Sequence, residues 1–153
     1  MTATLERPRV IPLRFTFDDM RELWPVLEPL IAKACEHSGG RYDVNAVAHA
    51  VYAGEMVLFG VACDRDVRAL VACAHMTWPT GLRTAEAVLM GAEEGAGRLE
   101  DECWDALIDN VLQWAGAVGS DRLVAHGRSG FKRRLKARGL NVRVTSELME
   151  MDL

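Results

Sequence analysis

The chain has 153 residues, of which 50% are hydrophobic and 26% are charged, with a formal net charge of -4. This size and composition are typical of one soluble globular domain and exclude a disordered or fibrous protein. The mild acidity argues against a surface built as a whole for nucleic acid, although it allows a local basic patch. We therefore predict a single domain over residues 1–153.

The cysteines and the N-terminal stretch bear on where the protein resides. The stretch MTATLERPRVIPLRF carries charges where a secretion signal needs its apolar core, and no apolar run approaches the ~18 residues of a membrane span. The four cysteines, Cys35, Cys63, Cys73 and Cys103, lie singly in apolar segments, without metal-ligand spacing. They indicate core residues in a reducing compartment, so we expect a cytoplasmic protein with neither a metal site nor a membrane partner.

The first elements are a strand and a helix. Residues 9–17 combine β-branched and aromatic side chains and predict a strand. The next segment predicts a helix that is capped by Thr16 or Asp18 and ends at the glycine pair at 39–40. Pro25 lies inside this helix, and an interior proline removes a hydrogen bond. We therefore expect the helix to be kinked or to begin late, near Pro25.

A second helix and three strands come next. Asp43 is the expected N-cap of this helix, and Gly54 closes it. The three strands are expected at 56–63, 68–78 and 82–90, with a hairpin turn at 64–66. Each strand is a nearly continuous apolar run, which is typical of burial on both faces. We therefore expect helices on both sides of the sheet.

The last third of the chain predicts a further helix, strand and basic helix. A wide apolar stripe marks the long helix and includes Leu99, Cys103, Leu107 and Val111. A short strand is expected at 122–127 and a short basic helix over 130–140. The ending, 141–153, predicts one bent strand or two short strands.

The stretch 91–101, GAEEGAGRLED, joins a predicted strand to a predicted helix. A glycine-rich turn at this place can hold a phosphate, because backbone N–H groups and the helix N-terminus face the anion. Glu93 and Glu94 bring like charge toward such an anion, whereas Arg98 is placed to compensate. The turn is thus open to two interpretations, an anion-binding loop or a connection that needs glycine for positive φ angles.

The element order, with this loop between the fourth strand and the third helix, resembles the GNAT superfamily of acyl-CoA-dependent N-acyltransferases. The resemblance rests on residues 24–61, on residues 88–140 and on the ending SELMEMDL. These stretches are most similar to small phage-encoded GNAT-like proteins with a degenerate acetyl-CoA loop. The resemblance implies an α/β (α+β) fold with a mixed, mostly antiparallel sheet of six or seven strands flanked by four helices.

The same resemblance implies acetyl transfer from acetyl-CoA to an unknown amine, on either a small molecule or a protein. The implied cofactor-binding residues are Met90, Gly91, Gly95, Ala96, Gly97 and Arg98, joined by Arg128 and Lys132. Glu86 or His75 is the candidate base for the amine proton, and Ser129 is the candidate acid.

Six cations fall within eleven residues and include no acid among them: Arg128, Lys132, Arg133, Arg134, Lys136 and Arg138. Three interpretations stay open, in this order: a solvated helix face, an anion site for the 3′-phosphate of coenzyme A, and a contact with nucleic acid or an acidic protein. Nucleic acid is disfavoured, because Phe131 is the one aromatic residue that interleaves with these cations.

A second hypothesis of a different class is a catalytically inactive GNAT scaffold. It would serve as a binding or virion-associated structural protein, in the host cytoplasm or the virion. Its contact surface would be the basic helix or an exposed sheet edge, against a virion protein or another copy of the chain.

Overall fold

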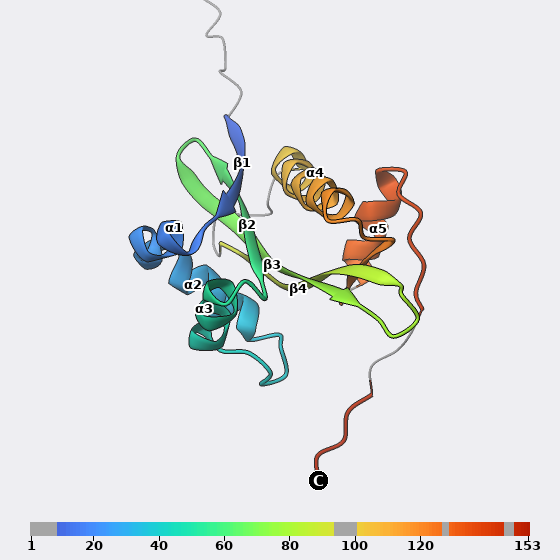
Figure 1. Ribbon diagram of the computed structural model, residues 1–153. Helices are drawn as coiled ribbons and strands as arrows, with labels where there is room; N and C mark the ends of the chain where they lie inside the picture. Colours follow the sequence, from blue (N-terminus) through green and yellow to red (C-terminus); the bar gives the residue numbers. More distant parts are fainter. Residues whose placement is uncertain (1–8, 94–100, 127–128, 146–148) are drawn as a thin grey trace, which may run out of the picture.

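The structure is a computed structural model that describes residues 9–93, 101–126, 129–145 and 149–153. Its core is one sheet with the strand order β1-β2-β3-β4-β5 (Figure 1). The strands are β1 (Val10–Phe15), β2 (Val57–Cys63), β3 (Asp66–Thr77), β4 (Arg83–Ala92) and β5 (Arg122–Ala125). The first four pair antiparallel, whereas β5 pairs parallel to β4. The predicted mixed, mostly antiparallel sheet is confirmed, with five strands over the described residues instead of six or seven.

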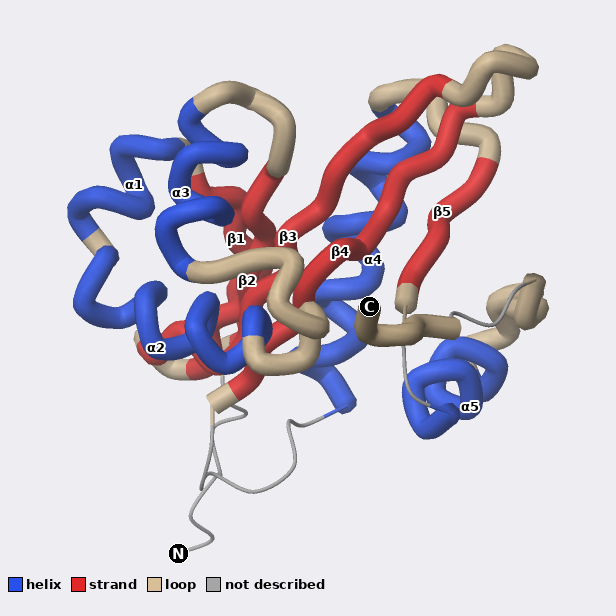
Figure 2. The backbone as a smooth tube through the Cα atoms, turned by 90° about the horizontal axis from the view of Figure 1, so that it is seen from below, coloured by secondary structure: helices blue, strands red, loops and turns tan. Residues whose placement is uncertain are grey.

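Helices cover both faces of this sheet. On one side lie α1 (Phe17–Glu22), α2 (Trp24–Cys35) and α3 (Val44–Tyr52), and on the other lies α4 (Asp101–Ala117), with α5 (Ser129–Ala137) beside it (Figures 1 and 2). Two separate apolar clusters fill the two interfaces, one built around Leu27 and Leu58 and the other around Phe59 and Leu107. The expectation from the continuous apolar runs, burial on both faces, is confirmed.

The first predicted helix is divided in two, so the described residues form five helices instead of four. Thr16 caps α1: its hydroxyl accepts from the Asp19 N–H at 3.1 Å, and the Asp19 carboxylate accepts from the Thr16 N–H at 2.9 Å. The hydrogen bond that the Thr16 N–H donates to the Asp19 carboxylate lowers the pKa of this carboxyl group. A hydrogen bond with the Thr16 side chain lowers it further. The helix breaks at Leu23, and Pro25 lies in the first turn of α2, where its missing N–H removes no helical hydrogen bond.

The C-terminal strands expected at 141–153 are not formed in the residues described there. Residues 141–145 and 149–153 carry no strand, and the side chains of Val144, Met149, Met151 and Leu153 are exposed. An alternating pattern marks a segment that suits a strand, but a strand also needs a neighbouring edge to pair with. In this structure the described residues of the segment pair with no strand.

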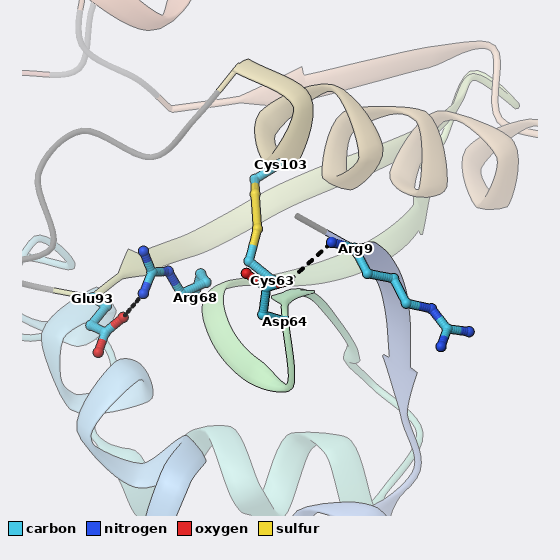
Figure 3. Close-up of a disulfide and its surroundings, with 6 residues drawn as sticks. All are labelled: Arg9, Cys63, Asp64, Arg68, Glu93 and Cys103. Atoms are coloured by element: carbon cyan, nitrogen blue, oxygen red, sulfur yellow. Dashed lines mark hydrogen bonds and ion pairs between the residues drawn. A yellow bond between two sulfur atoms is a disulfide. The ribbon is translucent and has the colours of Figure 1, made fainter. Parts of the chain in front are cut away.

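The cysteine prediction needs a correction. Cys63, at the end of β2, is joined to Cys103, in the first turn of α4, by a disulfide (Figure 3). Cys35 and Cys73 are free, and burial raises the pKa of the Cys73 thiol to about 12. The two bonded cysteines are 40 residues apart in sequence, and the spacing therefore gave no sign that the fold brings them together. The disulfide removes the argument for a reducing compartment.

Gly91 lets β4 approach α2 closely. A Cβ added at Gly91 would lie 2.3 Å from the backbone oxygen of Leu30 and 3.2 Å from the Cβ of Ala34. The obstructing oxygen belongs to the backbone of α2, so it cannot rotate away as a flexible side chain would. Any other residue at this position would push β4 and α2 apart.

We predict that Gly91→Ala lowers the free energy of unfolding by about 2–3 kcal/mol, because overpacking forces backbone movement. Gly116→Ala is the matched control: Gly116 is helical, and its added Cβ would meet no atom within 4 Å. In the last turn of a helix this change should stabilise by less than about 1 kcal/mol. Urea denaturation of both variants measures the difference, and equal stabilities would contradict the close packing at Gly91.

Thiol counting tests the disulfide. In denaturant without reductant, two thiols should react with Ellman's reagent, since two of the four cysteines are free. After reduction all four should react. In the folded protein Cys73 should react slowly at pH 8, because its raised pKa leaves little thiolate at that pH. Four reactive thiols in the unreduced, denatured chain would show that Cys63 and Cys103 are not bonded.

Candidate functional site

β5 pairs with only the first part of β4, and we call this partly paired arrangement the fork. Their parallel pairing covers four steps, from Thr84 opposite Arg122 to Ala87 opposite Ala125. The closed end is pinned by Arg83, whose N–H donates to the Asp121 carboxylate at 2.9 Å, while the Asp121 N–H donates to the Arg83 carbonyl at 2.8 Å. Figure 2 shows β5 ending beside β4, which continues past it.

A bulge in β4 lies where the fork opens. Opposite β3, Cys73 pairs with Ala87 and Ala72 pairs with Leu89, so Val88 has no partner in β3. A bulge bends its strand and increases the local twist. Because Val88 follows directly after the last residue that pairs with β5, the bend coincides with the end of the pairing between the two strands.

The open half of β4 presents a free backbone edge. Residues 88–92 have no partner strand on the β5 side within the described parts of the chain. The N–H and C=O groups on that edge can therefore bind an extended ligand, as an added strand would. On the other edge, β3 stays paired with β4 as far as Ala92.

Glu86 and His126 meet across the fork. Glu86 belongs to the paired half of β4, and His126 is the first residue after β5. The His126 Nε2 lies 3.1 Å from the Glu86 carboxylate, and the Glu86 side chain is 27% exposed. The carboxylate is thus held at the opening of the fork and remains accessible. Sequence reasoning named Glu86 but missed His126, because the strand register that brings them together leaves no sequence motif.

The structure separates Glu86 from His75. His75 pairs with Ala85, which packs in the cluster on the α4 side of the sheet. Successive residues of a strand point to opposite faces, so Glu86 points toward the side of α1–α3. The His75 Nε2 is buried without a hydrogen-bond partner among the described residues. The two candidate bases therefore belong to different environments and do not act as a pair.

Three of the predicted cofactor residues, Met90, Gly91 and Lys132, lie in the described parts of the chain. Met90 packs against the cluster on the α4 side, whereas Gly91 lies against α2. Lys132 is half-buried on α5, and Ser129 is the first residue of that helix. Gly95, Ala96, Gly97, Arg98 and Arg128 lie outside the described residues.

The acid that precedes the glycine-rich loop has a cation partner. Glu93 follows β4, and its carboxylate lies 3.2 Å from the Arg68 guanidinium on β3 (Figure 3). The Glu93 N–H also donates to the Arg68 carbonyl at 2.9 Å. Arg68 therefore partly neutralises the negative charge of Glu93. As a result, Glu93 repels an anion at the loop less than the sequence suggested.

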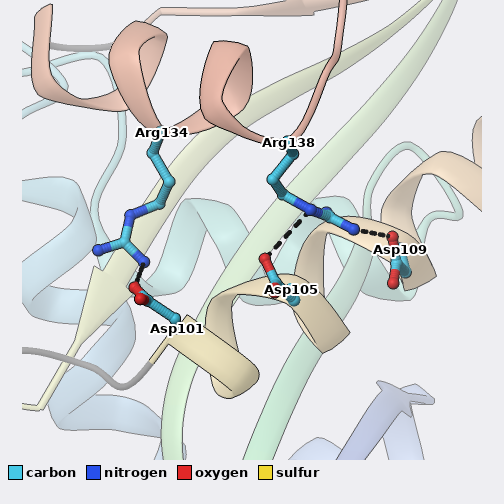
Figure 4. A network of polar contacts seen from close by, with 5 residues as sticks. All are labelled: Asp101, Asp105, Asp109, Arg134 and Arg138. Atoms are coloured by element: carbon cyan, nitrogen blue, oxygen red, sulfur yellow. Dashed lines mark hydrogen bonds and ion pairs between the residues drawn. The ribbon is translucent and has the colours of Figure 1, made fainter.

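Two members of the basic cluster contact α4: Arg134 of α5, and Arg138, which follows α5 directly. Arg134 lies 2.9 Å from Asp101, and Arg138 lies 3.1 Å from Asp105 and 2.6 Å from Asp109 (Figure 4). The three acids are spaced four residues apart and so share one face of α4. These contacts are partly exposed, and each contributes about 1 kcal/mol or less. These contacts nevertheless hold α5 beside α4. The four-residue spacing of the three acids was the one signal in the sequence that could have predicted the contacts.

Two classes of site receive no support from the described residues. Within them, no group of three or more histidine, cysteine or acidic side chains is arranged to hold a metal ion. The same residues contain no helix that is both long enough and apolar enough to cross a lipid bilayer.

Comparison with known proteins identifies the fold. No model of a known protein family matches the sequence, and a search of curated proteins finds no match. Solved structures do match. The ribosomal-protein-alanine N-acetyltransferase of Brucella melitensis biovar Abortus 2308 has a TM-score of 0.63 at 19% identity, covering 94% of this chain and 100% of that one.

Two further solved structures are similar over almost the whole chain. A predicted acetyltransferase of Clostridium acetobutylicum with acetyl-CoA has a TM-score of 0.63 at 14% identity, covering 94% of this chain and 96% of that one. A GNAT family acetyltransferase of Staphylococcus aureus has a TM-score of 0.61 at 12% identity, covering 93% and 98%. The chain has the GNAT fold. The fold expected from the sequence is thereby confirmed, and at these identities the likeness concerns the fold alone.

Proposed function

We propose that the protein is an N-acetyltransferase that uses acetyl-CoA and acts on an amine of a small molecule or a protein. The observation that carries this proposal is the fork, because the free edge of β4 at residues 88–92 lies beside the end of a parallel strand. The solved structures that share the fold include a predicted acetyltransferase with acetyl-CoA. The phage-type origin, the cytoplasmic or virion location and the inactive-scaffold alternative stay predictions from the sequence.

The residues at the fork fit an acyl-carrying chain. Backbone groups of residues 88–92 would bind it along the free edge, and Met90 would provide an apolar contact on the α4 side. The backbone N–H groups of Gly95, Ala96 and Gly97 would hold the diphosphate. Further positive charge would come from Arg98, Arg128 and Lys132. When bound, acetyl-CoA supplies an activated acetyl thioester.

Glu86 is the proposed base. An attacking amine must be neutral, and its proton has to pass to a nearby acceptor during the reaction. The Glu86 carboxylate lies at the opening of the fork and is partly exposed, so it can take this proton directly or through one water molecule. His126 would orient the carboxylate through their 3.1 Å contact, and Ser129 would donate a proton to the departing sulfur.

Binding of acetyl-CoA provides the first test. At a concentration one hundred times its Kd, a ligand that binds only the folded chain stabilises it by about 2.7 kcal/mol. For a chain of this size we expect the Tm to rise by roughly 5–10 °C. Gly97→Val should abolish the rise because its side chain would block backbone approach to phosphate, whereas Gly116→Ala should preserve it. No change in Tm at millimolar acetyl-CoA would favour the inactive scaffold.

Turnover provides the second test. Glu86→Gln should lower kcat by about 100-fold while leaving the acetyl-CoA-dependent rise in Tm intact, because it removes the base and not the binding edge. Release of the coenzyme A thiol in the presence of a panel of amines measures the rate. Glu55→Gln, at an exposed position after α3, is the matched control. His75→Gln tests the other candidate base. Full activity of Glu86→Gln would remove Glu86 from the mechanism.

A further inference from the structure

The disulfide between Cys63 and Cys103 ties the start of α4 to the sheet. Cys63 is the last residue of β2, and Cys103 lies in the first turn of α4, residues 101–104 (Figure 3). Cys103 is the one buried residue of that turn, since the other three are exposed or half-buried. The next buried residue of the helix is Leu107, about one turn further on. The disulfide is therefore the covalent link that holds the first turn against β2.

Without the disulfide, weaker contacts would hold the first turn. Asp101, whose side chain is 90% exposed, pairs with Arg134 at 2.9 Å. The Arg134 guanidinium lies 5.4 Å from the centre of the half-buried Trp104 ring. Both contacts lead to α5, and an ion pair this exposed contributes little stability. Deeper in α4, Leu107 and Val111 are buried in the cluster on that side of the sheet. Loss of the disulfide would therefore loosen the start of α4 and leave the rest of the helix packed.

This first turn is one of two anchors of the proposed diphosphate loop, residues 94–100, which lie outside the described residues. At the other end of the loop, the Glu93 carboxylate pairs with Arg68 of β3 at 3.2 Å, and the Glu93 N–H donates to the Arg68 carbonyl at 2.9 Å. Glu93 and Cys103 are thus tied to β3 and β2, which are neighbours in the sheet (Figure 3). The disulfide fixes the end of the loop at which helix N–H groups would face the diphosphate.

The placement of the two sulfur atoms suits a reducible bond. Cys63 is half-buried and precedes the exposed turn at 64–66, whereas Cys103 is 1% exposed. Cys63 is therefore the more accessible of the two. The first turn of a helix stabilises a thiolate. Of the acids in that turn, Asp101 is ion-paired and Glu102 is exposed to solvent, which screens its charge. Cys103 is thus suited to leave when a nucleophile attacks Cys63.

We propose that Cys63 and Cys103 form a redox switch of the acetyl-CoA site, in which the disulfide form binds the cofactor tightly and the dithiol form binds it weakly. The inference rests on the proposed function, because it concerns the regulation of the same site. The disulfide form has the first turn of α4 already fixed for binding. The dithiol form has to order this turn when the cofactor binds, and that ordering lowers the affinity.

A dithiol reductant supplies the two electrons for the switch. One of its thiolates attacks the Cys63 sulfur, the S–S bond breaks, and Cys103 leaves as a thiolate that takes a proton from water. The second thiolate of the reductant then displaces Cys63, which is protonated in turn. The protein is left with two thiols, and the reductant departs as its disulfide.

Titration calorimetry with acetyl-CoA compares the two redox states of the full chain. A phosphine reductant is used, because a thiol would also attack the thioester. If the first turn of the reduced chain occupies its bound position about a tenth of the time, the Kd rises about tenfold. We expect this rise on reduction and its reversal on reoxidation. Cys63→Ser should bind acetyl-CoA as the reduced chain does, without a response to reductant. Cys35→Ser, which removes a free cysteine, is the matched control and should keep the response.

Hydrogen exchange tests whether the first turn of α4 is the part that changes. In an α-helix the amides of residues 105–107 donate to the carbonyls of residues 101–103. These amides should exchange at least about tenfold faster after reduction, while the amides of β3 keep their protection as evidence of folding. This measurement needs no cofactor, so it reports on the disulfide independently of the proposed function.

The outcomes separate the two proposals. Equal Kd values in the two redox states, or tighter binding by the reduced chain, would overturn the switch and leave the proposed function standing. Unchanged exchange at residues 105–107 would overturn the switch as well, since the disulfide would then not hold the first turn. Absence of acetyl-CoA binding in both states would overturn the proposed function, and the switch with it. A response of Cys63→Ser to the reductant would assign the effect to another cysteine.

Discussion

The parallel pairing of β4 with β5 ends after four residues, and the site depends on this limit. β4 has to remain in the sheet along its whole length while it releases one edge. It does so because β3 pairs with it from Arg83 to Ala92 and because the bulge at Val88 bends it where β5 stops. A β5 that followed β4 further would close the edge and leave a continuous sheet with no opening.

A strand that loses one neighbour needs support from elsewhere, and α2 supplies it. Leu89 is buried in the cluster that contains Leu30 and Ala34 of α2. Gly91 lets the backbone of α2 come closer than any side chain would allow. The open half of β4 is thus held from the face of the sheet instead of from its edge. For this reason we assign Gly91 a packing role in addition to its predicted place beside a cofactor.

Periodicity predicted most of the elements and only part of the site. The apolar runs of β2 and β3 and the cap at Asp43 are local signals, and the structure has the corresponding elements. The bulge gives no such signal, because Val88 and Leu89 are both apolar and the alternation is lost there. The Cys63–Cys103 bond depends on contacts between elements distant in sequence. The described residues at 141–145 and 149–153 show the converse, a local strand pattern that pairs with no strand.

The electrostatic environment of the fork also could not be predicted from local sequence patterns. Along the sequence, Glu93 and Glu94 bring like charge toward an anion, and the cations at 128–138 form a basic run without an acid. In the structure, Arg68 pairs with Glu93, while Arg134 and Arg138 pair with the α4 acids. Opposite charges from separate elements therefore offset one another. The local potential depends on tertiary contacts that a linear count of charges does not contain.

The Glu86–His126 contact links strand register to chemistry. Glu86 lies opposite Val124, and His126, two residues further on, falls on the same face if the chain stays extended. A slip of β5 by one residue would turn His126 to the other face and leave the carboxylate without this partner. The register is set at the other end of the pairing, where Arg83 and Asp121 bond reciprocally. The geometry of the candidate base thus depends on the two hydrogen bonds between Arg83 and Asp121 at the closed end of the fork.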